Sequence, residues 1–397
     1  MTYSLWQPPR LRQDDTEATE RRATWLELFY DLVFVAAISQ LAHYLSAHLT
    51  WAGAASFGLM FVPLWWCWVG ATFYATRFDA DTLADRLLTF VQMGIVVAMA
   101  VNTHHGLKEG AVGFALCYAL FRGLLIGQYL IAGYFVPQAR SLARWYSTGF
   151  GVSVMLWFIS VWVPAPWRYL LWLLGLLVDF TTPLTAGRLV MTLPPSMTHI
   201  PERVGLFTII VLGESIIGVV NGLAELDWTL TAELTAILGL AIACSLWWLY
   251  FDSADGSPLK SMQKGRMAGG ITWLYAHLPL TASLTMTGVG VEHMVKKSLA
   301  ATPDLAERWL FCSAIAVALI VLAAIHWLTC TLGTPRFRQV LSTYRLASAA
   351  FVLFLGATGE GLTSIGLVTL VALACIIQVV MDIRRRRQPA VPRSSAT

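Results

Sequence analysis

Two carboxylates lie near the start of the first apolar run, in the stretch WLELFYDLVFVAAISQLAHYL at residues 25–45. Glu27 and Asp31 are four residues apart, so a helix places them on one face, one turn apart. Like charges that close cannot both ionise cheaply where the dielectric constant is low, so either one stays protonated or a cation or arginine lies between them. Glu27 also suits a plainer interpretation, an interfacial acid that complements the helix dipole.

Three further charged residues, Arg122, Asp179 and Glu214, fall near the middle of apolar runs. At ~1.5 Å per residue each lies about 15 Å into its run, close to the midplane of a ~30 Å hydrocarbon core. Charges there are costly and often mark ion or substrate pathways. We expect Arg122 to pair with Asp179 or Glu214, as a structural salt bridge or as a switchable pair. We also expect Glu214 or Asp31 to be the proton or cation site, with Arg122 as counter-ion.

Histidine and proline occur within the same kind of apolar run. His277 is a candidate for the ion pathway, although His277 and His326 could equally be packed, hydrogen-bonded side chains. Pro183 and Pro279 could interrupt their helices and free backbone carbonyls, or simply kink them. No close set of His, Cys and carboxylates suggests a metal site, and no cofactor is expected. The six cysteines all lie in apolar runs, which indicates packing rather than a disulfide framework.

The composition of the chain predicts which secondary-structure elements position these residues. The chain of 397 residues is 57% hydrophobic and 13% charged, and apolar runs near twenty residues recur along it. Such runs match the thickness of a bilayer core. We therefore predict an all-α polytopic membrane protein with about twelve transmembrane helices. They are predicted near 25–45, 53–74, 87–103, 112–134, 146–163, 168–187, 204–222, 231–251, 270–291, 309–332, 345–359 and 363–382.

Basic residues orient this topology. Of the 27 Lys and Arg, 21 fall in the two termini and the loops on their side, five fall in the opposite loops, and Arg122 lies inside a span. The positive-inside rule then places both termini in the cytoplasm. We expect a polar cytoplasmic N-terminus over 1–24 and a basic cytoplasmic tail over 383–397.

The two halves of the chain resemble each other. Three pairs of segments match in order, each placing one span on the span six further along: 27–41 with 205–219, 57–66 with 238–248, and 137–146 with 335–344. Six spans per half preserve orientation, so the pattern predicts a parallel 6+6 repeat, with six-helix units at 25–190 and 199–382. Transporters commonly have this arrangement, with the substrate path between the halves, and some channels share it.

Long motifs carry a resemblance to a known family. LELFYDLVFV, HIPERVGLFTIIVLGESIIGVV (199–220) and the HLP of the ninth run resemble the bacterial low-temperature-requirement A (LtrA) family. The resemblance implies an integral membrane protein of the bacterial cytoplasmic membrane that is linked to growth in the cold. It supplies no established role for any residue. The matching positions are Glu27, Phe29, Asp31, His199, Glu202, Arg203, Gly213, Glu214 and Ser215. FYDLVF (29–34) is also similar to the first helix of a family of endosomal and bacterial potassium channels.

These observations favour the hypothesis that the protein is a secondary transporter coupled to protons or a cation. The alternatives are a cation channel lined by the segment from Phe29 to Asp31, and a non-transporting membrane protein whose acids are structural. No common catalytic signature occurs, so an enzyme is not expected. The expected partners are the lipid bilayer and a small solute or ion, without nucleic acid. The sequence leaves the substrate, the coupling ion and the oligomeric state open.

Overall fold

The computed structural model describes residues 5–12, 23–79, 82–104, 106–194, 196, 199–224, 229–252, 257–262, 267–297, 301–329 and 335–386. Most of the polar N-terminus predicted over 1–24 and most of the basic tail predicted over 383–397 lie outside these residues. The chain divides into two compact units. One comprises Met1–Val211 with Met262–Arg266, and the other comprises Leu212–Ser261 with Met267–Thr397.

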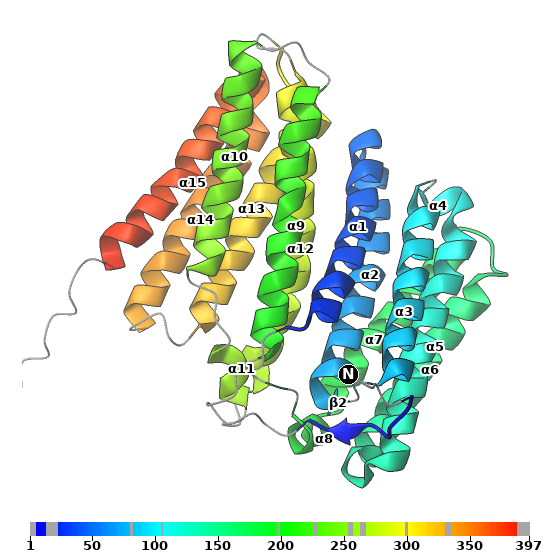
Figure 1. Ribbon diagram of the computed structural model, residues 1–397. Coiled ribbons are helices and arrows are strands. Elements are labelled where there is room, and N and C mark those ends of the chain that lie inside the picture. Colours follow the sequence, from blue (N-terminus) through cyan, green and yellow to red (C-terminus); the bar gives the residue numbers. More distant parts are fainter. Residues whose placement is uncertain are drawn as a thin grey trace, which may run out of the picture. The chain divides into compact units, whose positions relative to one another are not determined.

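The first unit consists of helices joined by short connections, with a two-stranded antiparallel pairing of β1 and β2 near the N-terminus (Figure 1). Its elements are β1 (Arg10–Leu11), α1 (Trp25–Ala47), α2 (Trp51–Arg77), β2 (Phe78–Asp79), α3 (Leu83–Thr103), α4 (Gly106–Glu109), α5 (Ala111–Phe135), η1 (Pro137–Ala139), α6 (Arg140–Ser160), α7 (Trp167–Thr185), α8 (Arg188–Thr192) and the first half of α9 (His199–Ala224). Within this unit α1 packs on α2 and α3, α3 on α5, α5 on α6, and α6 on α7.

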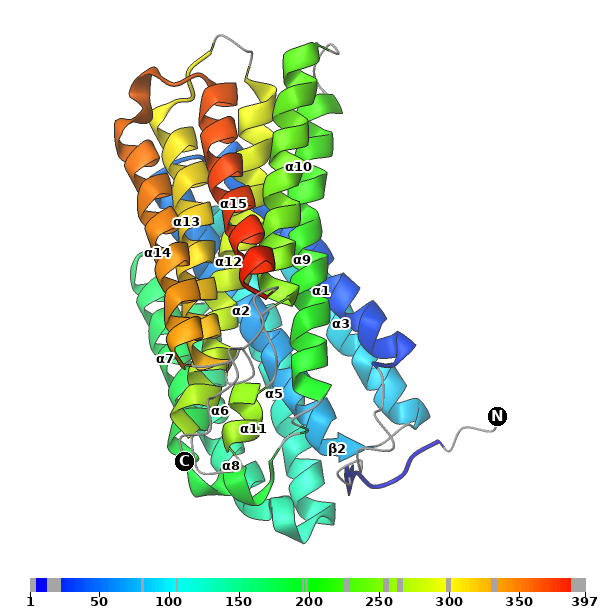
Figure 2. The same cartoon turned by 90° about the vertical axis from the view of Figure 1, so that its left-hand side faces the viewer.

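The second unit continues from the second half of α9, and its remaining long helices lie side by side in Figures 1 and 2. Its elements are α10 (Leu230–Phe251), α11 (Ser257–Met262), α12 (Met267–Lys296), α13 (Leu305–Leu328), α14 (Pro335–Thr358), η2 (Gly359–Gly361) and α15 (Ser364–Arg386). Here α12 packs on α13, α13 on α14, α14 on α15, and α10 on both α12 and α15.

Two glycines let helices of this unit approach backbone to backbone. A Cβ on Gly218 of α9 would lie 2.3 Å from the carbonyl oxygen of Gly288 on α12, and a Cβ on Gly288 would lie 2.6 Å from the carbonyl oxygen of Glu214. Small residues at such crossings are typical of helices packed in membranes. The GES segment of α9 therefore lies directly against α12.

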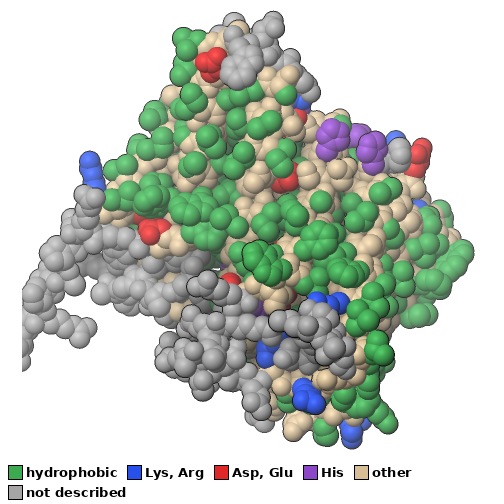
Figure 3. All heavy atoms as spheres, in the orientation of Figure 1, with side chains coloured by type: hydrophobic (Ala, Val, Ile, Leu, Met, Phe, Trp, Pro, Cys, Tyr) green, Lys and Arg blue, Asp and Glu red, His purple; other side chains and the backbone are tan. Residues whose placement is uncertain are grey.

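Nine helices within the described residues are long and apolar enough to cross a membrane: α1, α2, α3, α5, α9, α10, α13, the part of α14 and η2 from Arg338 to Gly361, and α15 up to Arg384. Their outward faces carry large apolar side chains, such as Leu87, Phe90, Val97 and Val101 along α3. Hydrophobic side chains likewise spread over the face seen in Figure 3. The prediction of a helical, multi-pass membrane protein is confirmed at this level.

The long helices α6, α7 and α12 occupy the other three predicted span positions but have a more polar composition. Hydroxyl groups account for much of this polarity. In α12, Thr281 donates to the carbonyl of His277 and Thr285 to that of Thr281, at 2.7 and 3.0 Å. Thr182 of α7 donates to Val178 at 2.6 Å. Such bonds satisfy the hydroxyl within its own helix, so it can be buried without another partner.

Prolines do not interrupt the helices. α12 continues through Pro279 and α7 continues past Pro183 to Thr185, and α2 likewise contains Pro63. The alternative that Pro183 and Pro279 break their spans is therefore wrong. Each helix loses one backbone hydrogen bond at its proline and retains the others around it.

Candidate functional site

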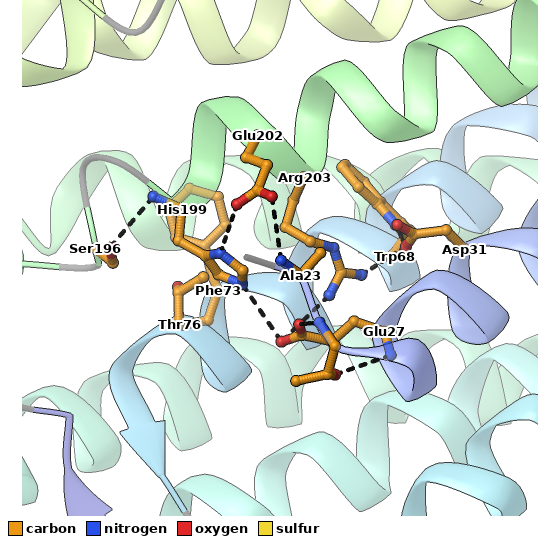
Figure 4. Close-up of polar contacts among 11 residues, drawn as sticks. Ala23, Glu27, Asp31, Trp68, Phe73, Thr76, Ser196, His199, Glu202 and Arg203 are labelled. Carbon is orange, nitrogen blue, oxygen red and sulfur yellow. Dashed lines mark hydrogen bonds and ion pairs between the residues drawn. The ribbon is translucent and has the colours of Figure 1, made fainter. Parts of the chain in front are cut away.

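The N-terminal end of α1 and the N-terminal end of α9 meet within the first unit (Figure 4). A capping box fixes the start of α1, because Thr24 Oγ1 accepts from the backbone N–H of Glu27 at 3.2 Å and Glu27 Oε2 accepts from that of Thr24 at 2.8 Å. The other carboxylate oxygen of Glu27 is thereby directed toward α9. The plainer interpretation of Glu27, as an acid that complements the start of its helix, thus accounts for Oε2. It does not account for Oε1, which contacts His199 and Arg203 of α9.

Arg203 lies between the carboxylates of Glu27 and Asp31. Its Nη2 donates to Asp31 Oδ1 at 2.5 Å, and its Nη1 lies 3.5 Å from Glu27 Oε1. Asp31 is fully buried and Arg203 is 2% exposed. This is one of the arrangements that two acids one turn apart require, an arginine shared between them. The counter-ion of Asp31 is Arg203 and not Arg122, so that part of the prediction is wrong.

Asp31 is bound asymmetrically. Trp68 of α2 donates its indole N–H to Oδ1 at 2.7 Å, the same oxygen that Arg203 contacts, and Phe207 of α9 stacks on the Trp68 ring with centroids 4.2 Å apart. Asp31 Oδ2 is buried and accepts no hydrogen bond from the residues that the structure describes. One oxygen of this carboxylate is held by two donors, whereas the other has open lone pairs.

His199 and Glu202 extend the cluster. The His199 ring nitrogens lie 3.4 Å from Glu27 Oε1 and 3.2 Å from Glu202 Oε2, so the imidazole bridges the two glutamates. Glu202 Oε1 also accepts from the backbone N–H of Ala23 at 3.1 Å. Glu202 and Glu27 therefore bind the consecutive N–H groups of Ala23 and Thr24, which joins the start of α9 to the entrance of α1.

A cavity of about 420 Å³ opens beside this cluster, entirely within the first unit. Its lining is rich in polar side chains from five helices and the N-terminal segment. The residues with polar side chains are Arg12, Thr24, Glu27, Tyr30, Thr72, Tyr74, Asp85, Arg86, Thr89, Gln92, Gln128 and Arg203. Glu27 and Arg203 thus belong both to the ion-pair cluster and to the wall of the cavity.

Arg122 and Asp179 form a separate buried pair, at 2.5 Å between Nη2 and Oδ1. Tyr118 and Ser153 donate to Asp179 Oδ2 at 2.5 and 2.7 Å, and the Arg122 guanidinium lies over the Phe150 ring at 4.0 Å. Both charges are fully buried, and both carboxylate oxygens have partners. Arg122 thus pairs with Asp179, one of its two expected partners, and these bonds join α5, α6 and α7. Nε and Nη1 of Arg122 are buried and donate to no acceptor among the described residues.

Glu214 belongs to the second unit. It is 5% exposed and lies where α9 contacts α12 through Gly288. Ser215 is fully buried, whereas a Cβ on Gly213 would meet nothing within 4 Å, so Gly213 is not the close-contact glycine of this motif. Phe29 of α1 is 51% exposed and takes no part in the cluster around Arg203.

His277 has both ring nitrogens satisfied. Nδ1 lies 2.7 Å from the carbonyl of Trp273, which can only accept, so Nδ1 carries a proton, and Nε2 lies 3.0 Å from the Tyr250 hydroxyl. This geometry corresponds to the packed, hydrogen-bonded histidine. His326 is fully buried on α13. Among the described residues no group of three His, Cys, Asp or Glu side chains is placed to hold a metal ion.

Lys297, just beyond α12, binds Asp304 and Glu307 at 3.3 and 3.2 Å, at the start of α13. Burial alone would lower the pKa of Lys297, but its hydrogen bonds and charge interactions with Glu307 and Asp304 outweigh burial and raise that pKa above its ordinary 10.5. These contacts link the two helices on the side of the protein opposite to the predicted cytoplasmic loops.

Comparison with known proteins agrees with the motifs. Residues 22–380 match the family described as bacterial low temperature requirement A protein (LtrA). The chain belongs to the LtrA family. A relative named "Uncharacterized protein RA0937" from Rhizobium meliloti (strain 1021) is 28% identical over 303 residues, which cover 70% of this chain and 71% of the relative. No solved structure matches.

The structure of this LtrA-family chain also contains a pair that the sequence analysis missed. Arg345 is the first residue of the span predicted over 345–359, yet it is fully buried inside α14 and binds Asp382 of α15 at 2.5 Å. Trp68, the second donor to Asp31, was likewise not singled out. A tryptophan facing the protein interior can be recognised as a donor only once its acceptor is placed, because nothing in the LWWCW run distinguishes it from its neighbours.

Proposed function

We propose that the protein is a secondary transporter of the bacterial cytoplasmic membrane that couples a small solute to protons or a cation. The observation that supports it is the buried Arg203 shared by Glu27 and Asp31 beside a polar cavity. An ionisable cluster inside membrane helices is costly to maintain, and its usual value is in moving ions or solutes. Membership of the LtrA family supports the integral membrane protein and leaves the solute to experiment.

The bonding at Asp31 suggests how a proton is coupled. A proton that adds to Oδ2, the oxygen without a described hydrogen-bond donor, displaces no existing partner. It removes the negative charge that faces Arg203, so the guanidinium keeps Glu27 as its sole carboxylate in this cluster. Because Arg203 and Glu27 also line the cavity, protonation of Asp31 changes the charge distribution presented to a bound solute. Loss of the proton restores the shared arrangement.

Twelve transmembrane helices in a parallel 6+6 repeat form part of this proposal. In the first unit α3 packs on α5, α5 on α6 and α6 on α7; in the second, α12 packs on α13, α13 on α14 and α14 on α15. The third to sixth long helices of each unit thus follow the same order of neighbours. The sixth helix of each unit also carries a buried aspartate paired with an arginine of that unit, Asp179 with Arg122 and Asp382 with Arg345.

The proposed orientation has both termini in the cytoplasm, on the strength of the Lys and Arg distribution. It places the ends of α1 and α9 that carry Glu27 and Arg203 toward the cytoplasm, with the cavity beside them. The proposal assigns the chain no catalytic step, cofactor or nucleic-acid partner.

Currents on a solid-supported membrane test the transporter directly. Proteoliposomes adsorbed to the sensor are exposed to a panel of amino acids, sugars, polyols and organic ions, and a transporter gives a transient charge movement with its substrate. We expect at least one class to give such a signal, and Asp31→Asn to abolish it. A panel without any signal contradicts the proposal. Unitary currents in planar bilayers would instead support the cation channel, for which the segment from Phe29 to Asp31 is the candidate lining.

A further inference from the structure

Residues 5–12 form an extended strap that joins the end of α2 to the start of α3, and Figure 1 shows its strand β1 beside β2. At one end of the strap, the backbone N–H of Arg12 donates to the carbonyl of Arg77 at 2.9 Å, and β1 pairs antiparallel with β2. At the other end, the carbonyl of Leu5 accepts from the backbone N–H of Ala84 at 3.2 Å, in the first turn of α3. The strap is therefore anchored at both of its ends to the first unit.

Both anchors of the strap adjoin the wall of the cavity. Phe78, which lies opposite Leu11 in the β1–β2 pairing, lines the cavity from the end of α2. Asp85, next to the anchor residue Ala84, lines it from the start of α3. Arg12, which directly follows β1, is itself part of the lining. The strap thus runs from one side of the wall to another and contributes its last residue to that wall.

Few contacts hold the strap between its anchors. The Trp6 ring packs edge-on against Phe135 at the end of α5, with centroids 5.3 Å apart, yet Trp6 remains 52% exposed and Leu5 76% exposed. Pro8 and Pro9 have no backbone N–H, so neither can donate a backbone hydrogen bond. A pairing of only two short strands is marginally stable in water. The strap can therefore detach at a small cost in free energy while the helices stay folded.

We propose that the strap is a lid, which restricts access to the cavity while it is bound to β2 and α3 and opens the cavity when it is released. Because Arg12 belongs to the strap and lines the cavity, release also removes a positive side chain from the wall. The open and closed states therefore differ in the charge that the cavity presents. As a gate for a transported solute the lid rests on the proposed function, but as a barrier to small molecules it can be measured without transport.

Labelling of a cysteine inside the cavity measures access. Thr89 of α3 lines the cavity, and the variant Thr89→Cys is reacted with a hydrophilic maleimide in the purified protein, with the labelled cysteines identified by peptide mass. Deletion of residues 2–12 should speed labelling at position 89 by about tenfold or more, since labelling through brief opening follows the population of the open state. Ser141→Cys, exposed near the start of α6, is the control outside the cavity and should label equally with and without the strap.

A disulfide tests the strap without removing it. Because Arg12 and Arg77 are hydrogen-bonded positions, Leu11 and Phe78 form the neighbouring non-hydrogen-bonded pair. The Cα atoms of such a pair lie about 4.5 Å apart, within the range that a disulfide spans. In Leu11→Cys/Phe78→Cys combined with Thr89→Cys, the oxidised form should label at position 89 about tenfold or more slowly than the reduced form. Comparing two redox states of one variant cancels the effect of losing the Phe78 ring.

The rates of labelling decide the outcome. Equal rates at position 89 in either comparison overturn the lid, and the disulfide comparison decides alone if the deletion variant does not give a monodisperse protein. Labelling that depends on the strap, in a protein that transports no solute of the panel, supports the lid and contradicts the proposed transporter. Transport that Asp31→Asn abolishes, together with equal labelling rates, supports the transporter and overturns the lid.

Discussion

Arg203 is the residue on which the cluster depends, because its guanidinium contacts both acids of α1, the half-buried Glu27 and the fully buried Asp31. Removing one partner of a buried ion pair leaves the other charge desolvated and uncompensated. Asp31 also receives a hydrogen bond from Trp68, which supplies a donor but no positive charge. The two contacts to Asp31 therefore have different consequences when each is removed.

Arg203→Ala should lower the free energy of unfolding by about 3–5 kcal/mol, since Asp31 would remain buried without its cation. Thermal unfolding in detergent, followed by fluorescence-detected size exclusion, measures the loss. Arg144→Ala, on the exposed face of α6, is the control and should stay within ~0.5 kcal/mol of the parent. An equal melting temperature for the two variants would show that Arg203 does not carry this interaction.

Trp68→Phe removes the indole N–H that donates to Asp31 and keeps an aromatic ring against Phe207. We expect a cost of about 1.5–3 kcal/mol, the usual range for a hydrogen bond to a charged group. Trp145→Phe, which removes a bond to the neutral carbonyl of Thr182, should cost only about 0.5–1.5 kcal/mol. If Trp145→Phe is the more damaging change in the same unfolding assay, the assignment of Trp68 fails.

At the scale of helices, α9 has two distinct contacts. Its N-terminal half carries His199, Glu202 and Arg203 to α1, and its C-terminal half packs on α12 through Gly218 and Gly288. One continuous helix thus positions both parts of the long family motif. The close glycine contact is between backbones, which cannot move aside as a flexible side chain could.

Gly218→Ala should therefore destabilise the protein by about 1–3 kcal/mol, because its Cβ would lie 2.3 Å from the Gly288 carbonyl oxygen. Gly213→Ala on the same helix meets nothing within 4 Å and should be neutral or stabilise the helix by up to ~1 kcal/mol. Melting temperatures of the two variants provide the comparison. Equal values would mean that α9 and α12 are not in backbone contact at Gly288.

The positions of the helices could be predicted from the sequence, and so could the need for a group that separates the charges of Glu27 and Asp31. Both follow from apolar length and helical spacing, which are local properties. It could not assign Arg203 as the answer, since Arg203 and Asp31 are 172 positions apart and no local pattern encodes that contact. Asp179 and Glu214 lie at the same predicted depth in the membrane as Arg122. The sequence therefore predicted that Arg122 has a carboxylate partner but did not distinguish between these two acids. Arg345 and Asp382 were missed because each lies near the end of a predicted span, where charge is ordinary.

For the whole molecule, the proposed topology places the α6–α7 and α12–α13 connections outside and the α5–α6 connection inside the cytoplasm. Alkaline phosphatase fused after Pro164 or Thr302 should be active, and a fusion after Gln138 should be inactive, because the enzyme folds only outside the cytoplasm. Green fluorescent protein fusions at the same positions should give the reverse pattern. Active phosphatase after Gln138 would invert the orientation and with it the cytoplasmic position of Glu27 and Arg203.

The central claim, that Asp31 couples a proton to solute movement through Arg203, is tested most directly by proton uptake. Proteoliposomes containing a lumenal pH dye receive a solute that gives a transport signal, and acidification of the lumen is recorded for the parent, Asp31→Asn and the control Glu233→Gln. The account predicts acidification with the parent and the control, and none with Asp31→Asn while solute binding persists. Acidification by Asp31→Asn at the parental rate would contradict it.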